Sequence, residues 1–206
     1  MLRIWGRLSS VNVQKVVWCA DELGLAYERI DAGGAFGVND TPEYLAMNPN
    51  GLVPVIDDDG FVLYESNAIV RYFAAKHAAG RLWPEALNAR ADADRWMEWQ
   101  STGYTPAMVT AFVQLCRTPA EKRDAAAIEA SRVKGETFSA VLDAHLAGRE
   151  FVAGKAFSVA DISVGCAAHR WLGLPIARTP RPNLERWYAA MKARPASKLV
   201  LSQPVK

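Results

Sequence analysis

The sequence contains few residues that could bind a metal, and they follow no recognisable motif. The cysteines Cys19, Cys116 and Cys166 lie far apart and form no C-x-x-C pair. The three histidines are equally scattered. We therefore expect no metal and, because structural disulfides are rare in reducing compartments, a cytoplasmic location.

The chain also lacks charge runs and long apolar runs. Its 24 basic and 22 acidic residues are interspersed and give a net charge of +2. No lysine and arginine cluster predicts a nucleic-acid partner, and no apolar segment predicts a signal peptide or a membrane span. With 50% hydrophobic residues among 206, the composition is that of a globular chain with a sizeable core.

Short β-like runs alternate with helical patterns in the first eighty residues. The helical patterns end at Gly24, Pro49 and Gly80, which are residues that stop helices. The expected order is β-α-β-α-β-β-α, with strands at 2–6, 26–32, 53–57 and 61–65 and helices at 13–24, 41–49 and 66–78. This order favours an α/β sheet covered by helices.

No convincing strand pattern appears after about residue 88. Helical patterns cover 89–116, 119–147, 157–173 and 181–196, and the first is expected to bend near Gly103 and Pro106. We predict two domains, an α/β domain at residues 1–77 and an all-helical domain at 88–206. Ser158 and Asp161 predict a capping box at the start of the third helix.

Pro54 stands inside an expected strand, where it cannot donate to a sheet ladder. One interpretation is a trans proline at the start of a strand, with no ligand, and spacing alone favours it. The other is a cis Val53–Pro54 bond. That bond would turn the N–H and C=O of Val53 out of the ladder, toward an extended peptide ligand.

Glu65 and Ser66 stand where a strand gives way to a helix, and they also allow two interpretations. They could simply start the helix, as capping residues commonly do. Alternatively, the free N–H groups and the Ser66 hydroxyl bind a carboxylate while Glu65 accepts from an ammonium group. The second arrangement would hold the head group of an amino acid.

The run "NPNGLVPVIDDDGFVLYESNAIVRYFA" closely resembles the glutathione-binding half of the cytosolic glutathione S-transferases. The element order is similar across the full chain, and "EFVAGKAFSVADISV" resembles the capping segment of the family's helical domain. The resemblance implies a thioredoxin-like N-terminal domain, an all-α C-terminal domain, a homodimer and a role in detoxification. It implies that glutathione is the co-substrate and a small hydrophobic electrophile its partner.

The resemblance also implies roles for individual residues. The backbone of Val53, before a cis Pro54, would meet the cysteinyl part of glutathione, and Glu65 and Ser66 would meet its γ-glutamyl end. Leu52 occupies a position that is often basic in relatives and contacts the glycyl carboxylate. That carboxylate would then be held by backbone N–H groups, by Lys15 or Arg7, or loosely.

We expect the thiol of glutathione to be activated at the first strand–helix junction, "GRLSSVNVQKV". A hydroxyl or amide donor at a helix N-terminus lowers the pKa of a thiol, and Ser9, Ser10 and Asn12 carry such donors. At least one of the three is expected to cap the helix instead. By resemblance, Ser10 matches the catalytic serine of theta-like members and Asn12 matches the amide of related bacterial ones. Cys19, farther into the helix, is expected to be a buried small hydrophobe.

The second substrate is expected between the two domains, with Trp99, Tyr104 and Met108 as candidate pocket residues, although aromatic residues at helical spacing usually pack in a core. Three other activities stay open. A glutathione-dependent disulfide reductase would use Asn12, and a non-catalytic module would only bind glutathione. An isomerase of conjugated diacids would need a cysteine where Val11 stands.

Overall fold

The computed structural model of the chain describes residues 1–206, and its first part has the predicted element order. The strands are shorter than the patterns suggest because only the residues between turns pair in a ladder. The elements are β1 (Leu2–Trp5), α1 (Val11–Glu22), β2 (Tyr27–Ile30), a short 3-10 turn η1 (Gly34–Phe36), α2 (Pro42–Met47), β3 (Val55–Asp58), β4 (Phe61–Tyr64) and α3 (Ser66–Ala78).

The four strands form one mixed sheet in the order β2-β1-β3-β4. β1 pairs parallel to β2 and antiparallel to β3, and β4 pairs antiparallel to β3. The expected strands at 53–57 and 61–65 form a hairpin, β3 and β4, and Asp59 and Gly60, both with positive φ, form its two-residue turn. β3 begins at Val55, two residues later than expected, because Val53 and Pro54 precede the ladder.

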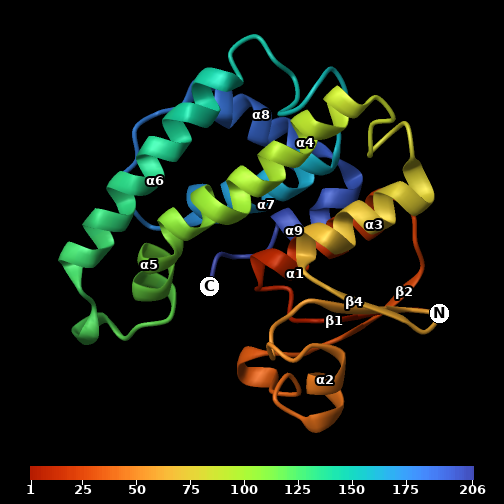
Figure 1. Ribbon diagram of the computed structural model, residues 1–206. Helices are drawn as coiled ribbons and strands as arrows, with labels where there is room; N and C mark the ends of the chain where they lie inside the picture. The colour runs from red at the N-terminus through yellow and green to blue at the C-terminus, as the bar shows by residue number, and fades with distance from the viewer.

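Helices cover both faces of this sheet. Figure 1 shows α1 and α3 side by side on one face and α2 on the other. The N-termini of α1 and α3 therefore open toward the same side of the domain as the segment that leads into β3. This placement brings together three segments that are far apart in the sequence.

The second part of the chain is helical, as predicted. Its elements are α4 (Leu87–Trp99), a π-helical segment η2 (Gln100–Tyr104), α5 (Thr105–Cys116), a turn η3 (Ala120–Lys122), α6 (Ala125–His145), α7 (Val159–Gly173), α8 (Pro182–Ala193), a turn η4 (Pro195–Ser197) and α9 (Lys198–Leu201). The expected bend falls at η2, where the chain packs closely on α6: a Cβ on Gly103 would come within 2.4 Å of Phe138. The division into domains at residues 1–77 and 88–206 stays a prediction.

One hydrophobic core runs through both halves of the molecule. Trp18 on α1 is fully buried against α7, where the bare backbone of Gly165 admits its ring. A Cβ at Gly165 would approach the indole to 2.8 Å. On the same helix, Glu22 accepts two hydrogen bonds from Arg194. The two halves are thus joined by close packing and a bidentate ion pair. No helix combines the length and the apolar character that a bilayer span requires.

The predicted capping box of α7 is present, and Asp161 does more than close it. Its carboxylate accepts hydrogen bonds from the Ser158 N–H at 3.0 Å, the Val152 N–H at 2.9 Å and the Trp187 indole N–H at 3.0 Å. Asp161 has no exposed surface. Burial raises the pKa of this carboxyl to about 6 despite these hydrogen bonds. Asp161 therefore ties α7 to α8 and to the preceding loop.

Candidate functional site

The first strand–helix junction leaves its polar groups unused by the protein. Ser10 occupies the N-cap position of α1, yet neither it nor any neighbour makes a side-chain capping bond. The expectation that Ser9, Ser10 or Asn12 caps this helix is therefore wrong. The backbone N–H groups of residues 11–13 have no partner within the chain, because the first helical bond is donated by Gln14 to the Ser10 carbonyl. Asn12 is exposed and Ser10 half-buried.

The segment before β3 is held by its neighbours so that the backbone of Val53 stays unpaired. The Leu52 carbonyl accepts hydrogen bonds from the Tyr44 hydroxyl and the Asn48 amide, each at 2.8 Å. Asn39 donates to the Gly51 carbonyl at 2.6 Å. Neither the N–H nor the C=O of Val53 has a hydrogen-bond partner in the chain, and the Val53–Pro54 bond is cis, as the family resemblance implies.

The start of α3 presents a similar set of free donors. Glu65 holds a left-handed backbone conformation with φ of 70°, which is unfavourable for a residue with a side chain. It is exposed and makes no capping bond. The N–H groups of residues 66–68 have no acceptor in the chain, since the first helical bond is donated by Ile69 to Glu65. A strained turn that exposes three donors is suited to an anion.

These three segments line one cavity of about 320 Å³. It brings together Ser10, Asn12, Leu52, Val53, Pro54, Glu65 and Ser66, whereas Ser9 and Lys15, which were also candidates, do not line it. The cavity is also lined by Arg7, which the sequence analysis named as one option for the glycyl carboxylate. Its remaining lining residues were not singled out from the sequence: Gly33, Gly34, Asn39, Asn48 and Gly51. The Arg7 guanidinium lies so close to Gly33 that a Cβ there would be 2.5 Å away.

A second cavity, of about 490 Å³, adjoins the first on the side of α4. The two share Asn12, Glu65 and Ser66. Its other lining residues are Lys15, Asn67, Ala68, Arg71, Glu98, Gln100, Ser101 and Thr105. The candidate site is therefore polar and open toward the helical half of the molecule.

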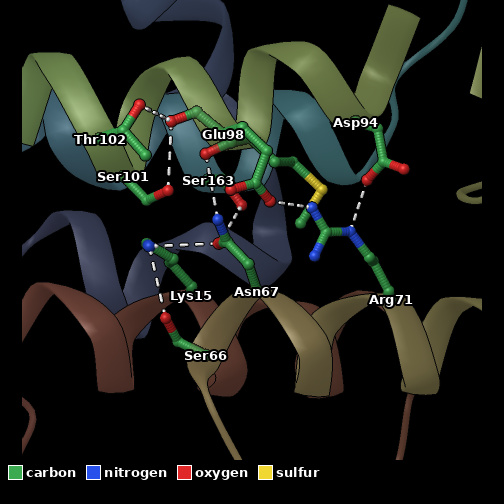
Figure 2. A network of polar contacts seen from close by, with 10 residues as sticks. Lys15, Ser66, Asn67, Arg71, Asp94, Glu98, Ser101, Thr102 and Ser163 are labelled. Atoms are coloured by element: carbon green, nitrogen blue, oxygen red, sulfur yellow. Dashed lines mark hydrogen bonds and ion pairs between the residues drawn. The ribbon is translucent and has the colours of Figure 1, made fainter. Parts of the chain in front are cut away.

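Lys15 lies beside Ser66 at the start of α3, and it does not line the cavity that contains Arg7, Asn39 and Asn48. Its ammonium group is buried and donates to the Ser66 hydroxyl at 3.4 Å and the Asn67 amide oxygen at 3.2 Å (Figure 2). No carboxylate pairs with it. Burial lowers the pKa of Lys15 to about 8, and the nearby Glu65 and Glu98 only partly oppose this effect.

Asn67 extends this network into the helical half. Its amide nitrogen donates to the Met97 carbonyl at 3.0 Å, and its oxygen accepts from Ser163 at 3.2 Å. Figure 2 shows Arg71, one turn farther along α3, pointing toward Asp94 and Glu98 of α4. Asn67 therefore links the start of α3 to α4 and α7.

The candidates for the second-substrate pocket lie elsewhere. Tyr104 and Met108 are completely buried in the core, and the Tyr104 hydroxyl pairs with Ser139 at 3.1 Å. Trp99 lines a separate hollow on the surface with Trp96 and His145. None of the three candidates lines a cavity that contains Ser10 or Ser66. Cys19, by contrast, lies in the core as expected, and burial raises the pKa of its thiol.

Comparison with known proteins identifies the same architecture. A family model described as the N-terminal domain of glutathione S-transferase matches residues 5–81, and one described as the C-terminal domain matches residues 125–190. Among curated proteins, Glutathione S-transferase GstB of Escherichia coli is 44% identical over all of both chains. Glutathione S-transferase 3 of Zea mays is 34% identical, over 95% of this chain and 90% of its own.

A solved structure also resembles this one closely. It is a theta class glutathione S-transferase of Xanthomonas axonopodis pv. citri with glutathione bound. It has a TM-score of 0.96 and 43% identity, and the match covers 100% of this chain and 99% of that one.

Proposed function

The chain belongs to the glutathione S-transferase family, and we propose that the cavity beside Ser10 is where it binds and activates glutathione. As a glutathione transferase, the protein joins the glutathione sulfur to an electrophile. One observation carries the assignment of the site. The unpaired donors at the N-termini of α1 and α3 and the unpaired backbone of Val53 line a single cavity. An extended tripeptide offers matching groups along its length.

The γ-glutamyl end of glutathione is proposed to lie at the start of α3. Its carboxylate accepts from the free N–H groups of residues 66–68 and from the Ser66 hydroxyl. Its ammonium group donates to Glu65. Lys15 supplies positive charge behind Ser66, and a bound carboxylate compensates a buried cation that the protein itself leaves without an acid.

The rest of glutathione is proposed to extend along the first cavity. The cysteinyl unit pairs with the N–H and C=O of Val53, as a strand added to the sheet would. The glycyl carboxylate then reaches the wall that contains Arg7, Asn39 and Asn48. Leu52, which is exposed, contributes only its backbone on that side. This arrangement replaces the basic side chain that relatives often carry at the position of Leu52.

The thiol of bound glutathione is proposed to lie at the N-terminus of α1. The Ser10 hydroxyl donates to the sulfur, and Asn12 is its alternative or partner. Together with the helix N-terminus they favour the thiolate over the thiol, and the proton passes to solvent. The sulfur then forms a bond to the electrophilic carbon, and the leaving group departs with its electron pair. The protein supplies electrostatic stabilisation and positioning, and no protein nucleophile is needed.

Binding and activity measurements test this proposal. Calorimetry should detect binding of reduced glutathione at millimolar concentration, and the absence of any heat would contradict the proposed site. A chloronitroaromatic substrate and a small disulfide should then be compared. Faster turnover of the aromatic supports conjugation as the main reaction. Faster reduction of the disulfide would favour the reductase activity that Asn12 keeps open.

The assembly and location of the protein belong to the same proposal. We propose a homodimer in the cytoplasm. The family resemblance implies the dimer, and the three cysteines are unpaired, as in proteins of a reducing compartment.

A further inference from the structure

Two guanidinium groups stack on one aromatic ring near the β1–α1 loop. The Cζ atom of Arg170, on α7, lies 4.0 Å from the centroid of the Phe112 ring. The Cζ atom of Arg117, at the C-terminal end of α5, lies 4.6 Å from the same centroid. Arg170 is only 9% exposed, whereas Arg117 is exposed. The contact with the aromatic ring accounts for the position of each guanidinium group, but it uses none of the N–H donors of that group.

Neither arginine has a polar partner in the protein. No side-chain hydrogen bond and no ion pair of the chain involves Arg117, Arg170 or the neighbouring Arg7. The three cations also repel one another. Arg117 and Arg7 add to burial in lowering the pKa of Arg170 to about 10, and Arg117 adds to burial in lowering that of Arg7. A buried cation without an acid is costly, which is typical of sites that receive an anion from outside.

This cluster lies on the side of the β1–α1 loop that faces the helical half. Arg170 and Phe112 line a hollow of only about 10 Å³ with Ser9, Gln14, His169 and the C-terminal residues Pro204, Val205 and Lys206. Arg7 lines the neighbouring cavity that contains Ser10 and Asn12. Arg7 and Arg170 therefore each share a cavity or hollow with a residue of the β1–α1 loop, Arg7 with Ser10 and Arg170 with Ser9.

We propose that the second substrate is an electrophile that carries a carboxylate, and that Arg117 and Arg170 bind this carboxylate while Phe112 contacts the apolar part. This inference rests on the proposed function, because it takes the sulfur of glutathione to lie at Ser10. Guanidinium groups match a carboxylate in both charge and geometry. A neutral hydrophobic electrophile would leave the buried cation of Arg170 uncompensated. The anionic class therefore replaces the simpler expectation of an entirely apolar substrate.

A matched pair of substrates tests the proposal. One is a chloronitrobenzoate with chlorine ortho to the nitro group, and the other is the neutral carboxamide of the same ring. In both reactions the thiolate sulfur forms a bond to the ring carbon, and the carbon–chlorine bond breaks with release of chloride. Each kcat/KM is divided by the rate constant of the uncatalysed reaction with glutathione, which removes the difference in ring reactivity. We expect a preference for the carboxylate of about tenfold or more, as for a charge-assisted contact.

Two variants and a control assign that preference to the arginines. Arg117→Gln changes an exposed residue and should reduce the carboxylate-to-carboxamide ratio by about tenfold. Arg170→Gln should reduce it at least as much if the variant folds. Lys122→Gln, which removes one positive charge from an exposed turn nearby, should leave the ratio unchanged. The Kd for glutathione, measured for each variant, separates a loss of electrophile binding from a loss of glutathione binding.

The possible failures are distinguishable. If the wild type shows equal corrected rates for the two substrates, or if Arg117→Gln leaves the ratio unchanged, the anionic electrophile is wrong while the glutathione site stands. If Lys122→Gln lowers the ratio as much as Arg117→Gln does, general charge rather than the cluster is responsible, and the proposal is overturned. If glutathione does not bind at all, the proposed function fails first.

Discussion

Replacing Asp161 with alanine removes an acceptor that three separate segments share. The carboxylate accepts from the backbone N–H groups of Val152 and Ser158 and from the indole N–H of Trp187. All these contacts are buried, so water cannot replace the lost acceptor. The variant should therefore lose much more stability than a variant of an ordinary helix cap, which typically loses about 1 kcal/mol.

The magnitude follows from two opposing effects. Each unpaired buried donor costs about 1–3 kcal/mol, so the three together cost about 6 kcal/mol. Against this, the substitution removes a buried negative charge. Because burial raises the pKa of Asp161 from 3.8 to about 6, removal of that charge recovers about 3 kcal/mol at pH 7. We expect a net decrease of about 3 kcal/mol in the free energy of unfolding.

The raised pKa of Asp161 also determines whether the free energy of unfolding rises or falls with pH. Between pH 3.8 and about 6 the folded state binds more protons at Asp161 than the unfolded state does. The free energy of unfolding contributed by this group therefore falls as the pH rises through that range. Lowering the pH from 7 to 5 stabilises the wild type by about 1 kcal/mol through Asp161 but not the alanine variant. The stability difference between the two should thus widen to about 4 kcal/mol at pH 5.

Urea unfolding at one protein concentration, at pH 7 and pH 5, measures both quantities. Asp124→Ala is the matched control, because Asp124 caps α6 through one exposed bond to the Ala127 N–H and should cost about 1 kcal/mol at either pH. Glutathione binding by the folded Asp161→Ala variant should be unchanged. A variant that keeps its stability but loses glutathione binding would refute this reasoning, as would a stability difference that narrows at pH 5.

Three further predictions concern the glutathione site and the assembly. Ser66→Ala should weaken glutathione binding by about 1–3 kcal/mol in calorimetry, because it removes a donor to the γ-glutamyl carboxylate, whereas Thr137→Ala on the exposed face of α6 should have no effect. Lys15→Met should weaken binding of S-methylglutathione at pH 7. The loss should be smaller at pH 9, since wild-type Lys15 has a pKa of about 8 and is largely uncharged there; an equal loss at both pH values would show that its charge is not involved. Light scattering should give about twice the chain mass of 22.6 kDa, and a monomer at any accessible concentration would contradict the proposed homodimer.

Much of the fold is predictable because the local patterns agree with the tertiary structure. Helix stops at Gly24 and Gly80, the Asp59–Gly60 turn and the Ser158–Asp161 capping box are all local signals, and each corresponds to an element boundary or a cap in the structure. The apolar run predicts the start of β3 two residues too early, because it continues through Val53 and Pro54, which do not pair in the ladder.

The less predictable features depend on contacts between distant segments. Arg117 and Arg170 belong to different helices, and only the folded chain brings both onto Phe112. Nothing in the local sequence indicates that the ammonium group of Lys15 is buried beside Ser66, because Ser66 is 51 residues away in the chain. Tyr104 and Met108 have the large side chains expected in a pocket for an apolar substrate. In the structure, η2 and α5 direct both side chains into the core. Asn48 is weakly indicated by the sequence, because an asparagine beside a proline and a turn often forms hydrogen bonds to the backbone of the loop, as Asn48 does to the Leu52 carbonyl.

The pKa of the glutathione thiol in the bound state tests the central claim most directly. Thiolate absorbance in the ultraviolet, followed against pH at saturating glutathione, gives this value for the wild type, Ser10→Ala and Asn12→Ala. We predict that the wild type lowers the pKa well below that of free glutathione and that Ser10→Ala raises it by about 2, the equivalent of one lost donor to a developing anion. A shift in Asn12→Ala alone would transfer the role to the amide. If the wild type leaves the pKa of the thiol at its value in free solution, the cavity beside Ser10 does not activate glutathione, and the account is wrong.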